Sequence, residues 1–455
     1  MDPALTALNR FGMGARVGER DELGGGADGA RDWLAAQLTA GPPSVDEVAS
    51  LDDVSKVLTL LDAAQQSQDQ DALQAATEQI GAIRAREARA MLTERVNSQR
   101  PFVERLVAFW SNHLCVSIGA SRPVVALAGH YERAAIRPHV LGRFDDMVLA
   151  SAQHPAMLFY LNNLISIGPI SDVGRRSSRR GNPRGLNENY ARELLELHTL
   201  GVGGGYDQDD VEQLARILTG WTVATVGNLA EPGERFGFLF RPELHEPSRK
   251  FVLGKRYREN GVAEGEEVIR DLCAHPSTST FIAGKLVAHF VDDDPPASAV
   301  ARIADVFRDS HGDLRRVSAA LVDLAAAWEP GHRKFRTPQD WLVALLRAAG
   351  AREAPENLDV LLNQLRHTPW RPASPKGYGD SRAEWADPAA LMNRAELARS
   401  IARRLSRGGR LAPDGLLGVM DVGADDPLVG LLADDAIPTR DRLALAFAGP
   451  AFQWR

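Results

Sequence analysis

The polar residues best suited to chemistry lie between Asn187 and Trp221. At about 100° per residue, the segment after Asn187 gathers four polar side chains on one face of a helix, namely Asn189, Arg192, Glu193 and Glu196. The opposite face is apolar apart from His198, which we leave out of the site for that reason. The spacing therefore predicts a two-faced helix whose polar side holds two carboxylates, an amide and a guanidinium.

Other residues able to do chemistry stand in the segments that flank this helix. His113 ends an apolar helical pattern, and His245 and Lys250 lie in and just after the loop of an expected β-hairpin. We predict four catalytic residues, which are His113, Glu193, Glu196 and His245. We predict six substrate-binding residues, which are Asn187, Asn189, Arg192, Lys250, Trp110 and Trp221.

Three interpretations of these residues remain open. In the first, the four catalytic candidates bind a divalent transition metal, because imidazole and carboxylate together suit Zn, Mn or Fe. In the second, Arg192 and Lys250 bind an anion while a Glu–His pair does acid–base chemistry. In the third, Arg192 and Glu196 form a helix salt bridge, Asn187 and Asn189 cap the helix, and the protein is a non-catalytic scaffold or binding protein. The sequence contains no GxSxG, HExxH, Walker or paired CxxC motif, so whether the chain is an enzyme stays open.

Local signals define the elements that position these residues. Gly201 follows the polar helix where a left-handed C-terminal cap is expected, and Asp207 can cap a second helix that runs to about Gly220. Pro101 starts the helix that carries His113. From residue 235 to 255 the apolar period becomes 2, which predicts one β-hairpin whose first strand carries Phe236, Phe238 and Phe240 and whose second strand carries Phe251 and Leu253.

Three further segments complete the expected arrangement. Lys285 and His289 stand one turn apart in an apolar helix, and we expect both to pack at the border of the core. The Pro- and Gly-rich segment from Trp370 to Trp385 predicts an ordered loop that covers a pocket. The arginine-rich segment 174–185 predicts a mobile loop that is either solvated or binds an anionic substrate or partner.

Composition and periodicity set the fold class. With 455 residues, 44% hydrophobic and 25% charged, the chain can build one large core or two ordinary ones. Nearly all strongly periodic segments have the helical repeat, which predicts a mainly α, multi-helix protein with one small β-hairpin insertion. We expect N-terminal helices and a helical arm in residues 1–100, a central helical core with the hairpin in 101–260, and a C-terminal helical part in 261–455, all within one fold.

Several classes of protein are disfavoured. No window approaches 18 consecutive apolar residues, so no membrane span is expected. The N-terminus lacks the pattern of an export signal, which predicts a cytoplasmic location. A formal charge of −7 argues against nucleic-acid binding. Cys115 and Cys273 are too few for a disulfide scaffold.

The run NEN-x-ARE-x2-EL-x-TLG, followed by GGY-x-Q-x-DV and LAR-x-LTGW, resembles the bacterial family catalogued as domain of unknown function 1800. The resemblance extends upstream to LNRFGMGAR and FWSNHL, and downstream through KFRTPQDWLVALLRAAG and SPKGYGD to Phe452. It spans nearly the whole chain and implies one family-wide fold, but it brings no established reaction. The aromatic-x-x-His pattern of the family favours a functional role for His113.

The resemblance also implies partners and ligands. Members of this family commonly occur together with members of the domain of unknown function 1501 family, and those proteins resemble the alkaline phosphatase and sulfatase fold. This implies a small anionic molecule or ester as ligand or, as an alternative, a role as export or maturation partner of such a hydrolase. The chain departs from the family pattern at Glu246, where relatives have Asp, at Arg366 and His367, where they have Gly-Gln, and at Tyr378, where they have Trp.

Overall fold

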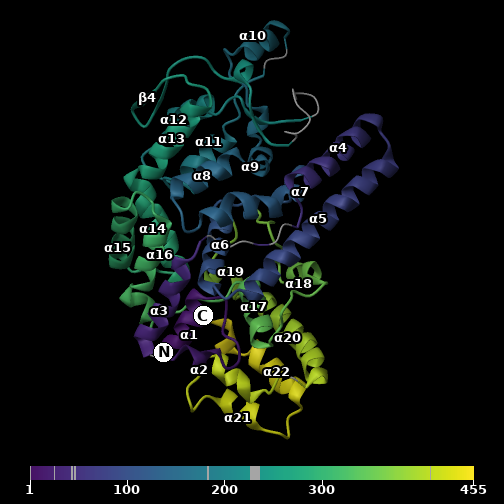
Figure 1. Ribbon diagram of the computed structural model, residues 1–455, viewed down its shortest axis with the longest axis vertical. Coiled ribbons are helices and arrows are strands. Elements are labelled where there is room, and N and C mark those ends of the chain that lie inside the picture. The colour runs from purple at the N-terminus through teal and green to yellow at the C-terminus, as the bar shows by residue number, and fades with distance from the viewer. Residues whose placement is uncertain are drawn as a thin grey trace.

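Helices form most of the chain in the computed structural model of the protein, as the periodicity predicts. The structure describes residues 2–24, 26–41, 45, 48–181, 184–225, 236–409 and 411–455. The N-terminal helices are α1 (Pro3–Leu5), η1 (Thr6–Phe11), α2 (Glu19–Leu23), α3 (Gly26–Thr39), α4 (Leu51–Ser67) and α5 (Gln70–Asn97). Helices α4 and α5 lie side by side and project from the body (Figure 1). No helix in the described part of the chain is long and apolar enough to cross a membrane.

The helices of the next part of the chain begin with α6, which runs through the centre of the molecule (Figure 1). They are α6 (Pro101–His113), α7 (Arg122–Tyr131), η2 (Glu132–Ile136), η3 (Arg137–His139), α8 (Phe144–Gln153), α9 (Pro155–Tyr160) and η4 (Asn163–Ile165). Pro101 begins α6, as predicted, and nearly every side chain of this helix is buried. The buried Glu104 pairs with Arg137, and the buried Arg105 pairs with Asp340. Charged residues are therefore tolerated all around α6, because each buried charge has a partner.

The polar segment predicted from the sequence forms α11 (Asn189–Glu193), the π-helical turn η5 (Leu194–His198) and α12 (Gln208–Ile217). Gly201 adopts a φ of 83°, which confirms the left-handed cap. Asp207 forms a capping box at the start of α12, which confirms its predicted role.

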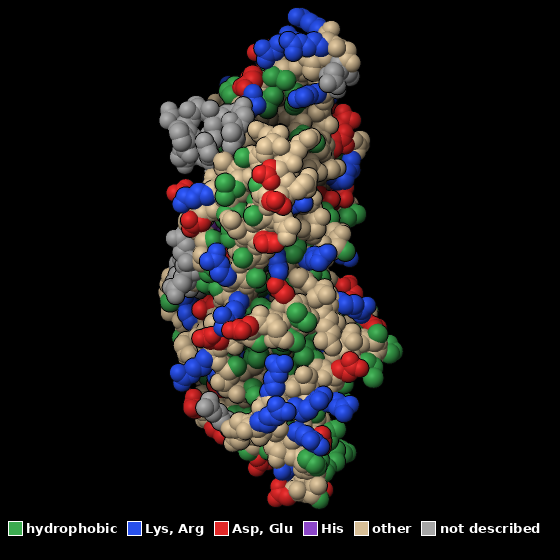
Figure 2. All heavy atoms as spheres, turned by 90° about the vertical axis from the view of Figure 1, so that its right-hand side faces the viewer, with side chains coloured by type: hydrophobic (Ala, Val, Ile, Leu, Met, Phe, Trp, Pro, Cys, Tyr) green, Lys and Arg blue, Asp and Glu red, His purple; other side chains and the backbone are tan. Residues whose placement is uncertain are grey.

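The arginine-rich segment is not a loop over most of its length. Asp172–Arg179 forms helix α10, whose first turn is capped by the Ser171 side chain. Its arginines, with Arg180, are exposed at one end of the molecule, where Figure 2 shows basic side chains gathered. Residues 182 and 183 of this segment lie outside the described residues.

The predicted single hairpin is replaced by two small antiparallel sheets. Strand β2 (Phe238–Phe240) pairs with β1 (Trp221–Val223), and β3 (Lys250–Val252) pairs with β4 (Lys255–Tyr257). The prediction that a strand with Phe251 and Leu253 pairs with the strand of Phe238 and Phe240 is wrong. Leu253 and Gly254 both adopt a positive φ, so the chain turns directly from β3 into β4 and these two strands pair with each other. Part of the expected hairpin, residue 235, lies outside the described residues. The short 3-10 helix η7 (Pro242–Leu244) follows β2 and leads to His245.

The remaining helices complete a mainly α fold and return the chain to its beginning. They are α13 (Val262–Ala274), α14 (Pro276–Phe290), α15 (Ala297–Asp309), α16 (Leu314–Val322), η8 (Ala325–Trp328), α17 (Pro338–Ala348), α18 (Leu358–Gln364), α19 (Arg382–Trp385), α20 (Pro388–Gly408), η9 (Asp414–Val419), α21 (Pro427–Ala433), α22 (Thr439–Ala448) and η10 (Pro450–Gln453). The Arg455 guanidinium donates a hydrogen bond to the Arg10 carbonyl, and the two termini lie in the same part of the molecule (Figure 1). The predicted mainly α fold class is confirmed.

Candidate functional site

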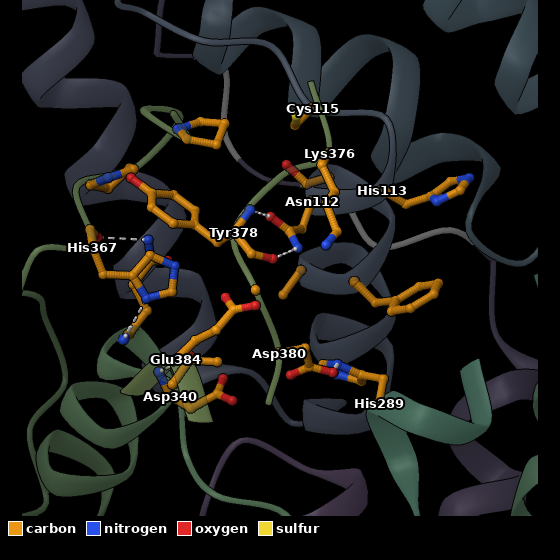
Figure 3. A pocket seen from close by; sticks show the side chains of 18 of the residues that line it. Asn112, His113, Cys115, His289, Asp340, His367, Lys376, Tyr378, Asp380 and Glu384 are labelled. Atoms are coloured by element: carbon orange, nitrogen blue, oxygen red, sulfur yellow. Dashed lines mark hydrogen bonds and ion pairs between the residues drawn. The ribbon is translucent and has the colours of Figure 1, made fainter. Parts of the chain in front are cut away.

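A polar cavity of about 320 Å³ lies between α6, α14 and the segment 366–385. Its wall includes Asn112 and His113 from α6, and Lys285 and His289 from α14. The segment 366–385 runs across it, so that Lys376, Tyr378 and Asp380 follow one another along the cavity (Figure 3). A volume of this size suits a small molecule.

The segment that covers the cavity is held rigidly against α6. The Asn112 side chain accepts a hydrogen bond from the Tyr378 backbone N–H and donates one to the Tyr378 carbonyl, both at 2.8 Å (Figure 3). The Trp370 indole donates to Glu132 at 3.1 Å, and the Trp385 indole donates to the Gly379 carbonyl at 2.9 Å. The prediction that this segment is an ordered loop covering a pocket is confirmed.

His113 is buried in the cavity wall with a defined tautomer. Its Nε2 lies 3.1 Å from the carbonyl oxygen of His198, at the end of η5. Because a carbonyl can only accept, Nε2 carries the proton and Nδ1 is an acceptor. The Nζ of Lys285 lies 2.9 Å from that Nδ1 and therefore donates to it. Burial and the neighbouring Lys285 hold the pKa of His113 well below its usual range, so the ring is neutral.

Lys285 is an amine in a poorly solvated setting without a compensating carboxylate. Burial lowers the pKa of Lys285 to about 8, and this outweighs the opposing influence of Cys115 and Asp380. The titratable and charged groups that face Lys285 from the surrounding elements are His113, His198, Cys115, Lys376 and Asp380. Burial also raises the pKa of Cys115 to about 12, so this residue is a neutral thiol.

His289 lies one helical turn beyond Lys285 and forms a pair with Asp380. Its Nδ1 lies 2.8 Å from Oδ2 of Asp380 (Figure 3), and its Nε2 has no hydrogen-bond partner among the residues that the structure describes. Burial lowers the pKa of His289 to about 4, against the opposing influence of Asp380. The ring is therefore neutral, donates from Nδ1 to the carboxylate and has a lone pair on Nε2. Lys334 and Arg455 also contact Asp380, and with His289 they outweigh the effect of burial and lower the pKa of this carboxyl.

The six lysines of the chain divide sharply by their partners. Four of them form ion pairs with carboxylates, namely Lys56 with Asp53, Lys250 with Glu264, Lys255 with Asp271, and Lys334 with Asp293. Lys285 and Lys376 form no such pair with the described residues, and these two lysines both line the cavity. The cavity therefore holds two lysines without an ion pair beside the His289–Asp380 pair, in a wall that also carries Glu132, Asp293, Asp340 and Glu384.

A wider open cleft lies on the other side of the covering segment. Pro372, Tyr378, Gly379 and Glu384 line both the cavity and this outer cleft. Two of the predicted site residues, Asn189 and Glu193, also line the cleft. Burial and the neighbouring Glu196 raise the pKa of the half-buried Glu193.

The residues predicted to form one site are divided among three places. His113 lines the inner cavity and Glu193 lines the outer cleft, whereas His245 lines neither. Among the residues that the structure describes, no three His, Cys, Asp or Glu side chains are grouped so that they could hold a metal ion. The proposed metal-binding set of His113, Glu193, Glu196 and His245 is therefore not assembled in the described part of the chain, because His113, Glu193 and His245 lie in three different places.

His245 and Lys250 form a closed, buried network with Glu264. The Nζ of Lys250 lies 2.9 Å from Oε2 of Glu264 and 3.2 Å from Nε2 of His245, and that Nε2 lies 3.1 Å from the same carboxylate oxygen. The Nδ1 of His245 lies 2.8 Å from the Thr219 carbonyl. Glu246 is likewise buried and pairs with Arg216 at 2.9 Å. These contacts connect parts of the segment 219–264 with one another. We therefore assign His245 and Lys250 a structural role.

The other predicted ligands also have structural partners. Arg192 pairs with Glu188 at 3.1 Å and with Glu196 at 3.5 Å on the helix surface. Asn187 accepts a hydrogen bond from the backbone N–H of Asn189 at 3.0 Å, as a capping residue does. These contacts are the ones that the scaffold interpretation expects.

Both tryptophans of the predicted site are core residues. Trp110 is buried between Phe109 and Phe144. Trp221 is buried against Phe238 and lies so close to Gly265 that a side chain there would overlap it.

Sequence reasoning missed Lys285, His289, Lys376 and Asp380. Lys285 and His289 were expected at the core border, although their i, i+4 spacing places both on one stripe of α14. Two polar groups at this spacing in an apolar helix are a usable signal for a shared cavity. Lys376 and Asp380 stand four residues apart in the motif SPKGYGD, within the segment predicted to cover a pocket.

The fold and the cavity define a mainly helical protein with a small pocket lined by both basic and acidic side chains. Residues 6–454 match the family described as "Protein of unknown function (DUF1800)", so the chain belongs to this family. No curated protein matches the chain. No solved structure matches it.

Proposed function

We propose that the cavity binds a small anionic organic molecule and that the chain is an enzyme that moves a proton on this ligand. The observation that carries the proposal is the division of the lysines. Four of six are paired with carboxylates, whereas Lys285 and Lys376, which line the cavity together with the paired Lys334, have no carboxylate partner in the described part of the chain.

A bound anion supplies the negatively charged partner that Lys285 and Lys376 lack among the described residues. Lys376 is exposed, so we assign it the mouth of the cavity and the first contact with a carboxylate, phosphate or sulfate group. Lys285 lies deeper, where a charged ammonium without a counter-ion is costly. Ligand binding relieves this cost, which favours anions over neutral molecules of the same size.

His289 is the proposed proton acceptor. Asp380 holds the proton on Nδ1 and leaves the Nε2 lone pair available, which is the arrangement that a general base requires. In the empty cavity burial lowers the pKa of His289 to about 4, which makes it a weak base. An anionic ligand in the same cavity raises this pKa, because negative charge stabilises the imidazolium form. Binding of the ligand therefore activates the base.

Two measurements on the purified protein test this function. Calorimetric titration with pyruvate, glycerol phosphate and phenyl sulfate measures anion binding. Proton NMR in D2O measures exchange of the methyl protons of pyruvate, which reports proton abstraction without requiring a known product. We expect the wild type to bind at least one of these anions, and to accelerate exchange if pyruvate is bound.

Three variants sharpen the test. His289→Gln should retain anion binding and reduce exchange by about 10²- to 10⁴-fold. Lys376→Met should weaken binding. Lys56→Met removes an exposed lysine of α4 whose partner is Asp53, and it should change neither quantity. A wild-type protein that binds none of the anions at millimolar concentration contradicts the proposed function.

The role as partner of a hydrolase of the alkaline phosphatase or sulfatase fold stays a prediction from the family resemblance. A role in binding a transition metal is not proposed, because the ligand set that was expected is not assembled.

A further inference from the structure

We propose that Lys285 is a nucleophile that forms an imine with the carbonyl carbon of its ligand, which makes small anionic aldehydes or ketones the substrate class. This inference rests on the proposed anion-binding function of the cavity and adds a covalent step to it.

A chain of hydrogen bonds orients the Lys285 amine. The His198 carbonyl fixes the proton of His113 on Nε2, and His113 Nδ1 then accepts one N–H of Lys285. The amine is thus held by a donated hydrogen bond, whether it is charged or neutral. When it is neutral, its lone pair is not consumed by this contact. The π-helical turn η5 ends at His198, so the polar helix recognised in the sequence contributes a backbone carbonyl to the site.

The surroundings of Lys285 favour the neutral amine. Neither flanking histidine carries a charge at neutral pH, so neither offsets the cost of burying the ammonium. Burial lowers the pKa of Lys285 to about 8, and Lys376 acts in the same direction. Desolvation and a neighbouring cation are the two features that activate lysines for imine formation.

The contrast with the other buried lysines is direct. Lys250 is bound to Glu264 at 2.9 Å, and Lys334 is bound to Asp293. Both are anchored by a carboxylate, which is the anionic partner that Lys285 lacks among the described residues. Lys285 is anchored by a neutral imidazole instead, so its chemistry differs from theirs although all three are largely enclosed.

Imine formation at Lys285 proceeds through a carbinolamine. The Lys285 lone pair forms a C–N bond with the carbonyl carbon, and the π electrons of the carbonyl move to oxygen, which takes up a proton. The nitrogen loses a proton to His289 or to water, which gives a carbinolamine. A second protonation of the oxygen by water expels it as water while the nitrogen lone pair forms the C=N bond of an iminium ion, and loss of the remaining N–H proton to solvent gives the imine. One amine and one carbonyl compound yield one imine and one water, with no oxidant or reductant.

Reductive trapping tests the inference on the full-length protein. The protein is incubated with pyruvate, glyoxylate or 2-oxoglutarate and sodium cyanoborohydride, which delivers hydride to the imine carbon. Intact mass spectrometry then counts the adducts, and peptide mapping locates them. With pyruvate we expect one adduct whose mass increase equals pyruvic acid less one oxygen atom, located at Lys285.

Controls within the same chain separate a specific adduct from general lysine labelling. Lys56 is an exposed lysine and serves as the internal reference for unspecific reaction. Lys285→Arg keeps a cation but cannot form a neutral imine, and it should remove the adduct. Lys56→Arg should retain the adduct at Lys285, because Lys56 lies outside the cavity.

The outcomes distinguish this inference from the function on which it rests. Adducts at Lys56 or Lys376 in preference to Lys285 overturn the imine. Calorimetric binding of any of the three oxo acids without an adduct also overturns the imine and leaves the anion-binding function standing. Failure to bind or trap any of these acids, together with failure to bind glycerol phosphate and phenyl sulfate, overturns both.

Discussion

Nζ of Lys285 lies 2.9 Å from Nδ1 of His113 and donates to it, so the partner of this largely enclosed amine is a neutral ring. The two residues come from different helices, α14 and α6, and they meet on the wall of one cavity. The arrangement stabilises the position of the amine without stabilising its charge. A residue held in this way is costly to the fold and useful to chemistry.

The first prediction follows from that cost. Lys285→Met should raise the free energy of unfolding by about 1 to 3 kcal/mol at pH 7, because the variant has no charge to desolvate. The folded pKa of about 8 lies below the usual 10.5, so the unfolded chain binds more protons between these values and wild-type stability rises with pH in that window. The advantage of the variant should therefore shrink as pH rises from 8 to 10.5. Urea unfolding of the variant and the wild type at several pH values measures this difference in the free energy of unfolding. A variant that is less stable than the wild type at pH 7 contradicts the prediction.

The second prediction concerns the buried network of Lys250, His245 and Glu264. Lys250→Met should lower the free energy of unfolding by about 3 to 5 kcal/mol, because it leaves Glu264 buried without its cation. Lys255→Met is the matched control, since this half-exposed lysine of β4 pairs with carboxylates on the surface and should cost about 1 kcal/mol or less. Thermal unfolding measures both. If Lys250→Met leaves stability unchanged but abolishes anion binding, Lys250 belongs to the site after all.

The third prediction separates Glu193 from the metal interpretation. Burial and Glu196 raise the folded pKa of Glu193, so its charged form destabilises the fold at neutral pH. Glu193→Gln should therefore raise stability at pH 7 by less than about 1 kcal/mol, and the gain should disappear in acid, where the carboxyl is protonated in both states. Glu196→Gln, which removes an ion pair with Arg192, should lower stability by about 0.3 to 0.5 kcal/mol. A large loss of stability in Glu193→Gln, with loss of a copurifying metal, would restore the metal interpretation.

How far the sequence predicts this molecule depends on the range of each signal. Local signals were reliable: Pro101, Gly201 and Asp207 each mark a helix end through a backbone requirement of that position. The pairing of β2 was mispredicted, because its partner β1 is separated from it by a long connection that period-2 alternation cannot identify.

The candidate site was predicted only in part for a related reason. His113 was found because it stands in a recurring motif, but its partner Lys285 is 172 residues away along the chain. The polar face of α11 suggested a reactive cluster, whereas Arg192 and Glu196 satisfy each other on the surface. Periodicity reports which face is polar, and only the packing of α6 against α14 decides which polar groups share a cavity.

The most direct test of the account is the titration of Lys285 itself. Competitive labelling with isotopic acetic anhydride from pH 6 to 11, followed by mass spectrometry of each lysine-containing peptide, measures the reactivity of all six amines in one experiment. Lys285 should become reactive with a midpoint near pH 8, well below the usual lysine pKa of about 10.4, and the exposed Lys56 is labelled in the same sample as the internal reference. A midpoint for Lys285 at or above that of Lys56, or an amine that stays unreactive across the whole range, would contradict the account of a neutral, accessible amine in the cavity.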